Sequence, residues 1–288
     1  KTTNDIVDIV VKDVRTGLTR DKFTNKCERL IDGNYWWVPM PGKVKNLGDI
    51  DLYFYLNNEF QGKKRLYYSG GKDLIIEGEK QILDYLDGFD YPTFWEIFIN
   101  GDYEKEPSCV VEEGDVVLDI GGNKGFFTLN AIQKGASKVY VVEPIKQTFD
   151  DLNKVTNNLK NITTINSAIS ENDGSVSMFI NKESSAKSCL TNYSELFDTH
   201  SEEVIVDSIN INTLLKQIDT KINFMKVDCE GSEFEIFKTI TDKNLKSINK
   251  LVVETHGDEI GHFVYDKLVS ANFEVHKHGD ILFATNLN

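Results

Sequence analysis

Apolar runs and amphipathic stretches alternate through the second half of the chain. Residues 116–119 form an apolar run of strand length that stops at a glycine-rich turn, and residues 126–134 then continue with helical spacing. The next apolar run covers residues 139–142. After it, a helix over residues 145–160 is predicted, because its apolar positions recur every three or four residues: Ile145, Phe149, Leu152, Val155 and Leu159. Strands that alternate with helices are typical of a mostly parallel sheet covered on both faces.

Further strands are predicted after residue 160, each a short run rich in apolar and β-branched residues: 163–169, 175–180, 203–208, 223–228 and 250–254. Two more runs, 273–276 and 280–284, are separated by a turn at Gly279 and predict a closing antiparallel hairpin. We therefore expect an α/β fold with a Rossmann-like, mostly parallel sheet and a C-terminal antiparallel hairpin.

The leading part of the chain has a different character, with many aromatic residues interrupted by Gly and Pro. Short strands are predicted at residues 51–56, 66–68 and 74–76, preceded by one or two helices within residues 1–30. The basic stretch Gly62-Lys63-Lys64-Arg65 is interpreted as a solvated turn between strands. We predict a smaller accessory region, helical and β-rich, over residues 1–107 and the α/β domain over residues 108–288.

Charge and composition exclude several classes of protein. Lys plus Arg number 32 and Asp plus Glu number 46, which gives a formal net charge of −14 and disfavours a nucleic-acid partner. Apolar runs are far shorter than a membrane span needs, and no signal peptide is visible in a sequence that begins at Lys1. The four cysteines are widely spaced, without a CxxC pair, so free thiols and a cytoplasmic location are expected.

Candidate cofactor residues follow the first strand of the α/β part. Asp119, Gly121, Asn123 and Gly125 form a strand-to-helix turn where a ligand can approach the helix N-terminus. Glu143 ends the next strand, where a carboxylate can accept both hydroxyls of a ribose. Two nucleoside cofactors compete, NAD and S-adenosylmethionine. The second is favoured because Ile120 replaces a glycine of the dinucleotide fingerprint, and because the carboxylate of Asp119 would repel a pyrophosphate.

A second motif lies within residues 224–233, FMKVDCEGSE. Asp228 ends a strand at the edge where open α/β sheets bind ligands, and strand alternation places Lys226 on the same face, where the two side chains can pair. Ser232 followed by Glu235 predicts a capping box at the start of a helix.

DIGGNKGFF, VVEP and FMKVDCEGSEFEIF occur in an order and spacing that resemble the FkbM family of S-adenosylmethionine-dependent methyltransferases, over about residues 108–285. The resemblance implies the cofactor S-adenosyl-L-methionine and methylation of oxygen on sugars, glycans or small metabolites. It leaves the acceptor and the oligomeric state open. Two alternatives stand beside it, a non-catalytic cofactor-binding scaffold whose N-terminal module binds a glycan or partner, and an NAD-dependent oxidoreductase.

The remaining candidate residues are assigned to the adenine, to a lid and to catalysis. Asn166, Ser167 and Ala168, after the third strand, are expected beside the adenine, and residues 181–202 are expected to form a lid. Asp228, Glu230 and His256 are assigned to catalysis on the acceptor side, with His256 as the candidate base because imidazole titrates near neutral pH. Asp228, Glu254 and His256 could together offer ligands to a divalent ion, but without a ligand-spacing motif no metal is predicted.

Overall fold

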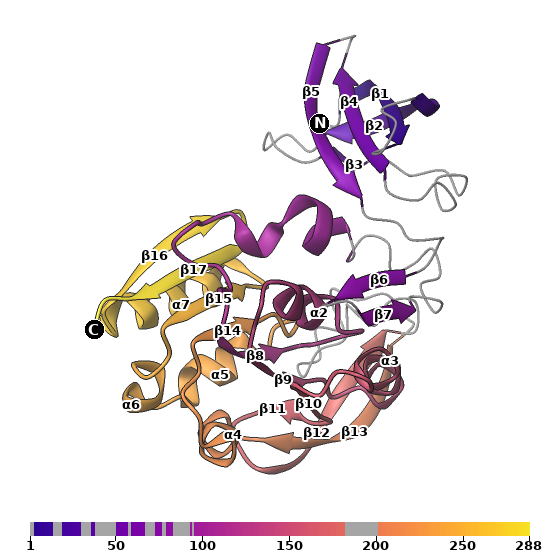
Figure 1. Ribbon diagram of the computed structural model, residues 1–288. Coiled ribbons are helices and arrows are strands. Elements are labelled where there is room, and N and C mark those ends of the chain that lie inside the picture. The colour runs from indigo at the N-terminus through magenta and orange to yellow at the C-terminus, as the bar shows by residue number, and fades with distance from the viewer. Residues whose placement is uncertain are drawn as a thin grey trace. The chain divides into compact units, whose positions relative to one another are not determined.

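A computed structural model describes the backbone of strands β1 to β7, residue 93, and residues 95–181 and 201–288 (Figure 1). The chain divides into two compact units, Lys1–Tyr91 and Pro92–Asn288. The boundary predicted from the sequence, between residues 107 and 108, therefore falls within the second unit, and most of the predicted lid lies outside the described residues.

The first unit is described as two antiparallel sheets. One has the order β3-β2-β1-β4-β5, and β6 pairs with β7 in the other. The strands run over Thr3–Asp13 (β1), Thr19–Arg29 (β2), Trp36–Trp37 (β3), Ile50–Leu56 (β4), Glu59–Leu66 (β5), Asp73–Ile76 (β6) and Glu79–Ile82 (β7).

Two expectations for this unit were wrong. The helices predicted within residues 1–30 are the paired strands β1 and β2, which agrees with the many β-branched residues of β1. The turn predicted at Gly62-Lys63-Lys64-Arg65 is part of β5, where the pairing with β4 shifts register close to Gly62. A β-bulge at that point explains the glycine without a chain reversal.

The second unit contains a seven-stranded sheet with the order β10-β9-β8-β14-β15-β17-β16. Strands β8 to β10, β14 and β15 are parallel, and β17 and β16 form the predicted antiparallel hairpin. Their bounds are Val116–Ile120 (β8), Lys138–Val142 (β9), Ile162–Ile165 (β10), Phe224–Val227 (β14), Lys250–Glu254 (β15), Phe273–His278 (β16) and Ile281–Asn286 (β17). The predicted α/β fold class is confirmed.

Three other strands form a separate small sheet in the order β11-β13-β12. They cover Ala168–Ile169 (β11), Gly174–Asn181 (β12) and Ser201–Ile209 (β13). The strand predicted over residues 163–169 is thus split, with its first part in the main sheet and its end in this one.

Helices cover both faces of the main sheet, because the side chains of each strand alternate between them. On one face Asp119 of β8 accepts a hydrogen bond from Thr128 of α2. On the other face Leu118 and Ile120 pack in a buried cluster with Phe237 of α5 and Leu268 of α7. The helices run over Trp95–Asn100 (η2, a π-helix), Asp102–Glu104 (η3), Phe126–Gln133 (α2), Lys146–Thr156 (α3), Ile211–Ile218 (α4), Glu233–Thr239 (α5), Asp242–Leu245 (α6) and Asp258–Ser270 (α7).

Within the residues that the structure describes, no helix combines the length and hydropathy needed to cross a bilayer. The carboxyl ends of β8, β9, β14 and β15 meet at one edge of the sheet, and the candidate site lies there.

Candidate active site

The turn after β8 lies directly against the end of β14. Gly121 has φ +78°, and a Cβ atom at this position would stand 1.7 Å from the carbonyl oxygen of Asp228. The amides of Gly121 and Gly122 donate to the carbonyl of Val142 at 3.1 and 2.9 Å, which ties the turn to the end of β9. Glycine at position 121 is therefore needed both for its backbone conformation and for the close approach of two strands.

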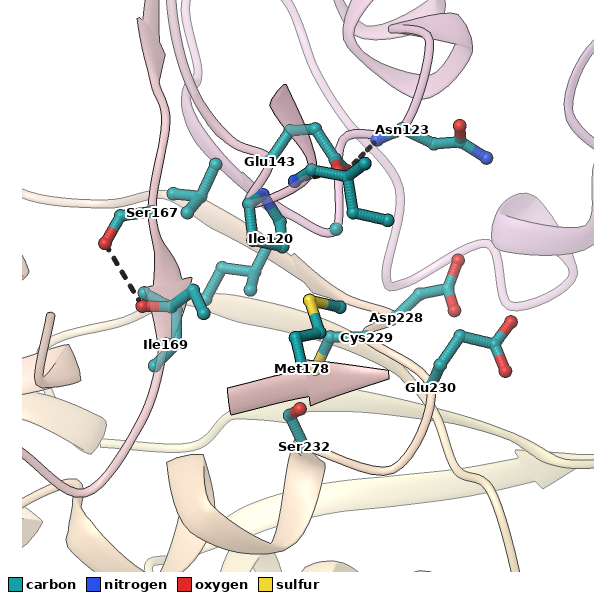
Figure 2. Close-up of a pocket in the computed structure, with 15 residues that line it drawn as sticks. Ile120, Asn123, Glu143, Ser167, Ile169, Met178, Asp228, Cys229, Glu230 and Ser232 are labelled. Atoms are coloured by element: carbon teal, nitrogen blue, oxygen red, sulfur yellow. Dashed lines mark hydrogen bonds between the residues drawn. The ribbon is translucent and has the colours of Figure 1, made fainter. Parts of the chain in front are cut away.

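Glu143 follows β9 and is buried at 5% exposure. Its Oε2 accepts the amide of Asn123 at 3.0 Å, and its Oε1 accepts the amide of Ile145 at 2.9 Å (Figure 2). Burial raises the pKa of Glu143 to about 7, although both hydrogen bonds favour the ionised form. Each carboxylate oxygen can accept a second hydrogen bond, so the group can receive two hydroxyls.

A first pocket opens beside Glu143, with about 620 Å³ of space that includes open solvent. It is lined by both apolar and polar side chains: Ile120, Gly121, Asn123, Val142, Glu143, Pro144, Ile145, Ser167, Ala168, Ile169, Met178, Asp228, Cys229, Glu230 and Ser232. Figure 2 shows Asp228 and Glu230 extending to one side of this pocket, away from Ser167 and Ile169. The pocket thus has an apolar part and an acidic end.

Three of the predicted cofactor residues lie outside this lining. Asn166 donates from Nδ2 to the carbonyls of Glu143 and Pro144 at 2.8 and 3.0 Å, so it fixes the backbone that carries Glu143. Asp119 is fully buried beneath the turn. Gly125 precedes α2 with φ +88°. These three residues therefore belong to the backbone framework around the pocket and not to its lining.

A buried lysine connects the two sequence motifs. The ammonium of Lys226 donates to the carbonyl of Gly121 at 2.8 Å and pairs with Asp228 at 3.2 Å and Asp119 at 3.5 Å. The predicted pairing of Lys226 with Asp228 is confirmed. Burial opposes ionisation of Asp228, but the charges of Lys226 and His256 outweigh burial and hold its pKa below its usual value.

A second pocket of about 540 Å³ shares one wall with the first. Gly121, Asn123, Asp228 and Glu230 line both pockets. The rest of the second pocket's lining comes from residue 93, η2, η3, the turn after β8, α2 and the ends of β14 and β15: Thr93, Glu96, Ile97, Tyr103, Gly122, Phe126, Phe127, Lys226 and Glu254.

Four carboxylates line the second pocket, namely Glu96, Asp228, Glu230 and Glu254. Burial and the neighbouring negative charges raise the pKa values of Glu96, Glu230 and Glu254, each to about 7. The pocket therefore favours ligands that donate hydrogen bonds or carry positive charge.

Tyr103 joins the ends of two strands. Its hydroxyl lies 2.9 Å from Asp228 Oδ2 and 2.7 Å from Glu254 Oε2, and its ring packs edge-on against Phe127 at a centroid distance of 5.6 Å. The sequence reasoning missed this residue, because nothing in the spacing links position 103 to a strand end 125 residues later.

Glu233, the first residue of α5, is fully buried and organises the loop after β14. Its carboxylate accepts the amides of Cys229 and Gly231 at 3.0 Å each. The predicted capping box does not form, because Ser232 makes no side-chain cap hydrogen bond. Glu230 and Gly231 both have positive φ, at 52° and 99°, and this bend brings the Glu233 carboxylate back under the loop.

His256 follows β15 and lies behind the two pockets without lining either. Nδ1 lies 3.1 Å from Glu233 Oε1, and Nε2 lies 3.5 Å from Glu230 and 4.0 Å from Asp228. Burial would lower the pKa of His256, but the hydrogen bond to Glu233 and the charges of the three carboxylates raise it to about 10. A protonated imidazole accepts no proton, so this environment argues against the predicted role of His256 as base at neutral pH.

Comparison with known proteins adds three findings. The model of the methyltransferase FkbM domain matches residues 119–282, more than half of the chain. Methyltransferase 1 of Beauveria bassiana is 26% identical over 178 residues, which cover 55% of this chain and 70% of that protein. The hexuronic acid methyltransferase AglP of Haloferax volcanii is 29% identical over 148 residues, which cover 50% of this chain and 57% of that protein, so the match spans little more than half of that relative.

Among solved structures, fibrillarin of Aeropyrum pernix, in complex with natively bound S-adenosyl-L-methionine, aligns over 82% of this chain and 94% of that chain. The identity is 13% and the TM-score is 0.42.

Proposed function

The chain belongs to the FkbM methyltransferase family, and on that premise we propose that it methylates a hydroxyl group of a sugar, a glycan or a related small metabolite. It is an S-adenosylmethionine-dependent methyltransferase. This membership overturns the NAD-dependent oxidoreductase alternative.

The first pocket is the proposed cofactor site. Glu143 would accept the two ribose hydroxyls, and Ser167 and Ala168 would lie beside the adenine. The turn at Gly121 and Asn123 would receive the methionine part of the cofactor. Asp119, Gly125 and Asn166 would act through the backbone that they hold.

The second pocket is the proposed acceptor site, and the observation that supports this proposal is that the two pockets share lining residues. A methyl donor in the first pocket and an acceptor in the second would meet at Asp228 and Glu230, which line both. In the transfer, an acceptor oxygen attacks the methyl carbon, the carbon–sulfur bond breaks, and the hydroxyl proton leaves. Because Glu230 is 28% exposed at this junction, it is the proposed acceptor of that proton, while His256 holds Glu230 and Asp228 from behind.

Charge favours a hydroxyl acceptor over a carboxylate. The four carboxylates of the second pocket would repel an acid group, whereas a hydroxyl can donate to them. The name of the relative AglP, hexuronic acid methyltransferase, supports a sugar as the acceptor class. On a hexuronic acid, whose own carboxylate the pocket would repel, we expect a ring hydroxyl to enter the pocket and receive the methyl group.

The proposal is tested by release of S-adenosylhomocysteine from the purified chain with three acceptor sets: neutral sugars and glycosides, hexuronic acids, and alcohols without a sugar. Mass spectrometry of the product distinguishes a methyl ether from a methyl ester. We expect a base-stable methyl ether. A base-labile methyl ester as the main product would contradict a hydroxyl acceptor.

The scaffold alternative is tested by the same assay. A scaffold would bind S-adenosylmethionine yet release no S-adenosylhomocysteine with any acceptor. In the scaffold alternative the N-terminal part would bind a glycan or partner. For the enzyme we propose that the accessory region ends at Tyr91 and that Pro92–Asn288 is the catalytic part, because Glu96 and Tyr103 line the proposed acceptor pocket.

A further inference from the structure

Three side chains with metal-binding atoms converge where β14 and β15 end. Asp228, Glu254 and His256 each offer one such atom, and these atoms lie within 4.8 Å of one another. The side chains of Asp228 and His256 are 24% and 27% exposed, so an ion from solvent can reach them. Two carboxylates and an imidazole in this arrangement form a candidate cation site rather than an acidic patch.

His256 is oriented as a metal ligand would be. A carboxylate only accepts hydrogen bonds, so the 3.1 Å contact with Glu233 places one hydrogen of the His256 imidazolium on Nδ1, and the second hydrogen, on Nε2, would leave when a cation binds there. Nε2 is then directed toward Asp228 and Glu230. Glu233 is itself fixed by loop amides, and such carboxylate–histidine pairs orient metal-binding imidazoles in proteins.

The two carboxylates are held apart in a defined way. Tyr103 contacts Oδ2 of Asp228 and Oε2 of Glu254, and Lys226 pairs with the same Oδ2. Within the described part of the chain, Asp228 Oδ1 and Glu254 Oε1 accept no hydrogen bond. Each carboxylate thus has one oxygen anchored by the protein and one available to an ion.

Carboxylates outnumber cations at this point. Glu96 and Glu230 line the same pocket as Asp228 and Glu254, and Lys226 is the one cation among the described side chains that line it. The His256 imidazolium lies beside Asp228 and Glu230, and the Lys226 ammonium also contacts Asp119 and the carbonyl of Gly121. A bound dication would replace the proton lost from His256 and add positive charge among these carboxylates.

We propose that Asp228, Glu254 and His256 bind a divalent cation at the junction of the two pockets. Mixed carboxylate and imidazole ligands suit Mn²⁺ better than Mg²⁺ or Ca²⁺, which prefer oxygen alone. Further coordination positions would face the second pocket, which Asp228 and Glu254 line. Resting on the proposed function, the ion would bind the acceptor hydroxyl and ease the loss of its proton to Glu230.

Binding is tested with Mn²⁺ on the full chain, freed of metal by a chelator, without cofactor or acceptor. Electron paramagnetic resonance counts free Mn²⁺ during the titration, and we expect one bound ion per chain. His256→Ala and Glu254→Gln should each weaken Mn²⁺ binding at least tenfold. His276→Ala is the matched control, because His276 is exposed at 44% on β16 and lies beside Glu274; it should bind Mn²⁺ as the unchanged chain does.

No stoichiometric Mn²⁺ binding by the unchanged chain would overturn the site, and this result does not depend on whether any variant folds. Equal affinity in a folded His256→Ala variant would overturn it as well. If methyl ether still forms after chelation, without bound Mn²⁺, the cation has no role in the transfer, and this result would contradict the cation proposal while leaving the proposed function intact. Mn²⁺ binding without methyl ether formation would support the site while contradicting the proposed function.

Discussion

At the scale of single residues, Glu143 carries the most direct prediction. Hydrogen bonds to a charged group are each worth about 1.5–3 kcal/mol, so Glu143→Gln should weaken S-adenosylmethionine binding at least tenfold. Isothermal titration calorimetry gives the affinity, and thermal unfolding checks the fold. Glu274→Gln, at an exposed position on β16, is the control and should bind the cofactor normally. Unchanged affinity in folded Glu143→Gln would remove Glu143 from the cofactor site.

The raised pKa of Glu143 adds a dependence on pH. In the free chain its pKa is about 7 because of burial, and ribose hydroxyls would stabilise the ionised form and lower that pKa on binding. Binding must then release a proton below about pH 7, so cofactor affinity should fall as the pH drops, by up to about tenfold per unit from this group. Calorimetry between pH 5.5 and 7.5 measures this slope, and it should be smaller in Glu143→Gln. Equal slopes in both proteins would assign the effect to other groups.

Replacement of Lys226 measures how much a buried ion pair contributes to the free energy of unfolding. Lys226→Met would leave Asp119 and Asp228 without their shared cation, and breaking a buried pair costs about 3–5 kcal/mol. The comparison is Lys238→Met, whose pair with Glu171 is exposed to solvent and should contribute little to stability. Urea unfolding gives both free energies. Similar losses in the two variants would show that the ion pairs of Lys226 contribute no more to the free energy of unfolding than an exposed ion pair does.

At the scale of elements, two glycine-to-alanine variants can distinguish steric overlap at the turn between β8 and α2 from backbone strain alone. Gly121 and Gly279 both have positive φ, so alanine at either position should cost about 1–2 kcal/mol in backbone strain. At Gly121 the new Cβ would also overlap the Asp228 carbonyl, whereas at Gly279 no atom lies within 4 Å. Gly121→Ala should therefore lose cofactor binding and several times more stability than Gly279→Ala, as measured by calorimetry and urea unfolding. Equal losses would mean that the two strands can move apart.

Elements with strong periodicity were predictable, and contacts between distant elements were not. The strand at residues 116–119, the helix after it and the C-terminal hairpin follow from local patterns that tertiary packing reinforces. The β1 and β2 pair was missed because apolar β-branched residues near charged ones fit a helix and a strand alike. In the site, Asp228 and Glu143 were found from their places at strand ends. Tyr103 and the role of Glu233 depend on chain folding that no local spacing encodes.

At the scale of the whole molecule, the division at Tyr91 and Pro92 predicts which part folds alone. A protein of residues 92–288 should fold and bind S-adenosylmethionine as the full chain does. A protein of residues 108–288 lacks Ile97 and Tyr103, which are buried within the second unit, and loss of one large buried aromatic costs about 3–5 kcal/mol. Urea unfolding and calorimetry compare the two. Equal stability would place the boundary at residue 108, as the sequence predicted.

The order of strands in the main sheet also decides when the site can form during synthesis. Gly121 and Lys226 are 105 positions apart, yet they are joined by a hydrogen bond at the centre of the site. Closing so long a loop is slow, and a chain leaving the ribosome has β8 and β9 long before β14 and β15. A nascent or truncated chain that ends before β14 therefore has the contact of the glycine-rich turn with Val142 but not its contact with Lys226, and it has no complete cofactor site. Because the cofactor binds only the folded arrangement, added cofactor would not speed the early steps of folding. It would stabilise molecules that have already folded.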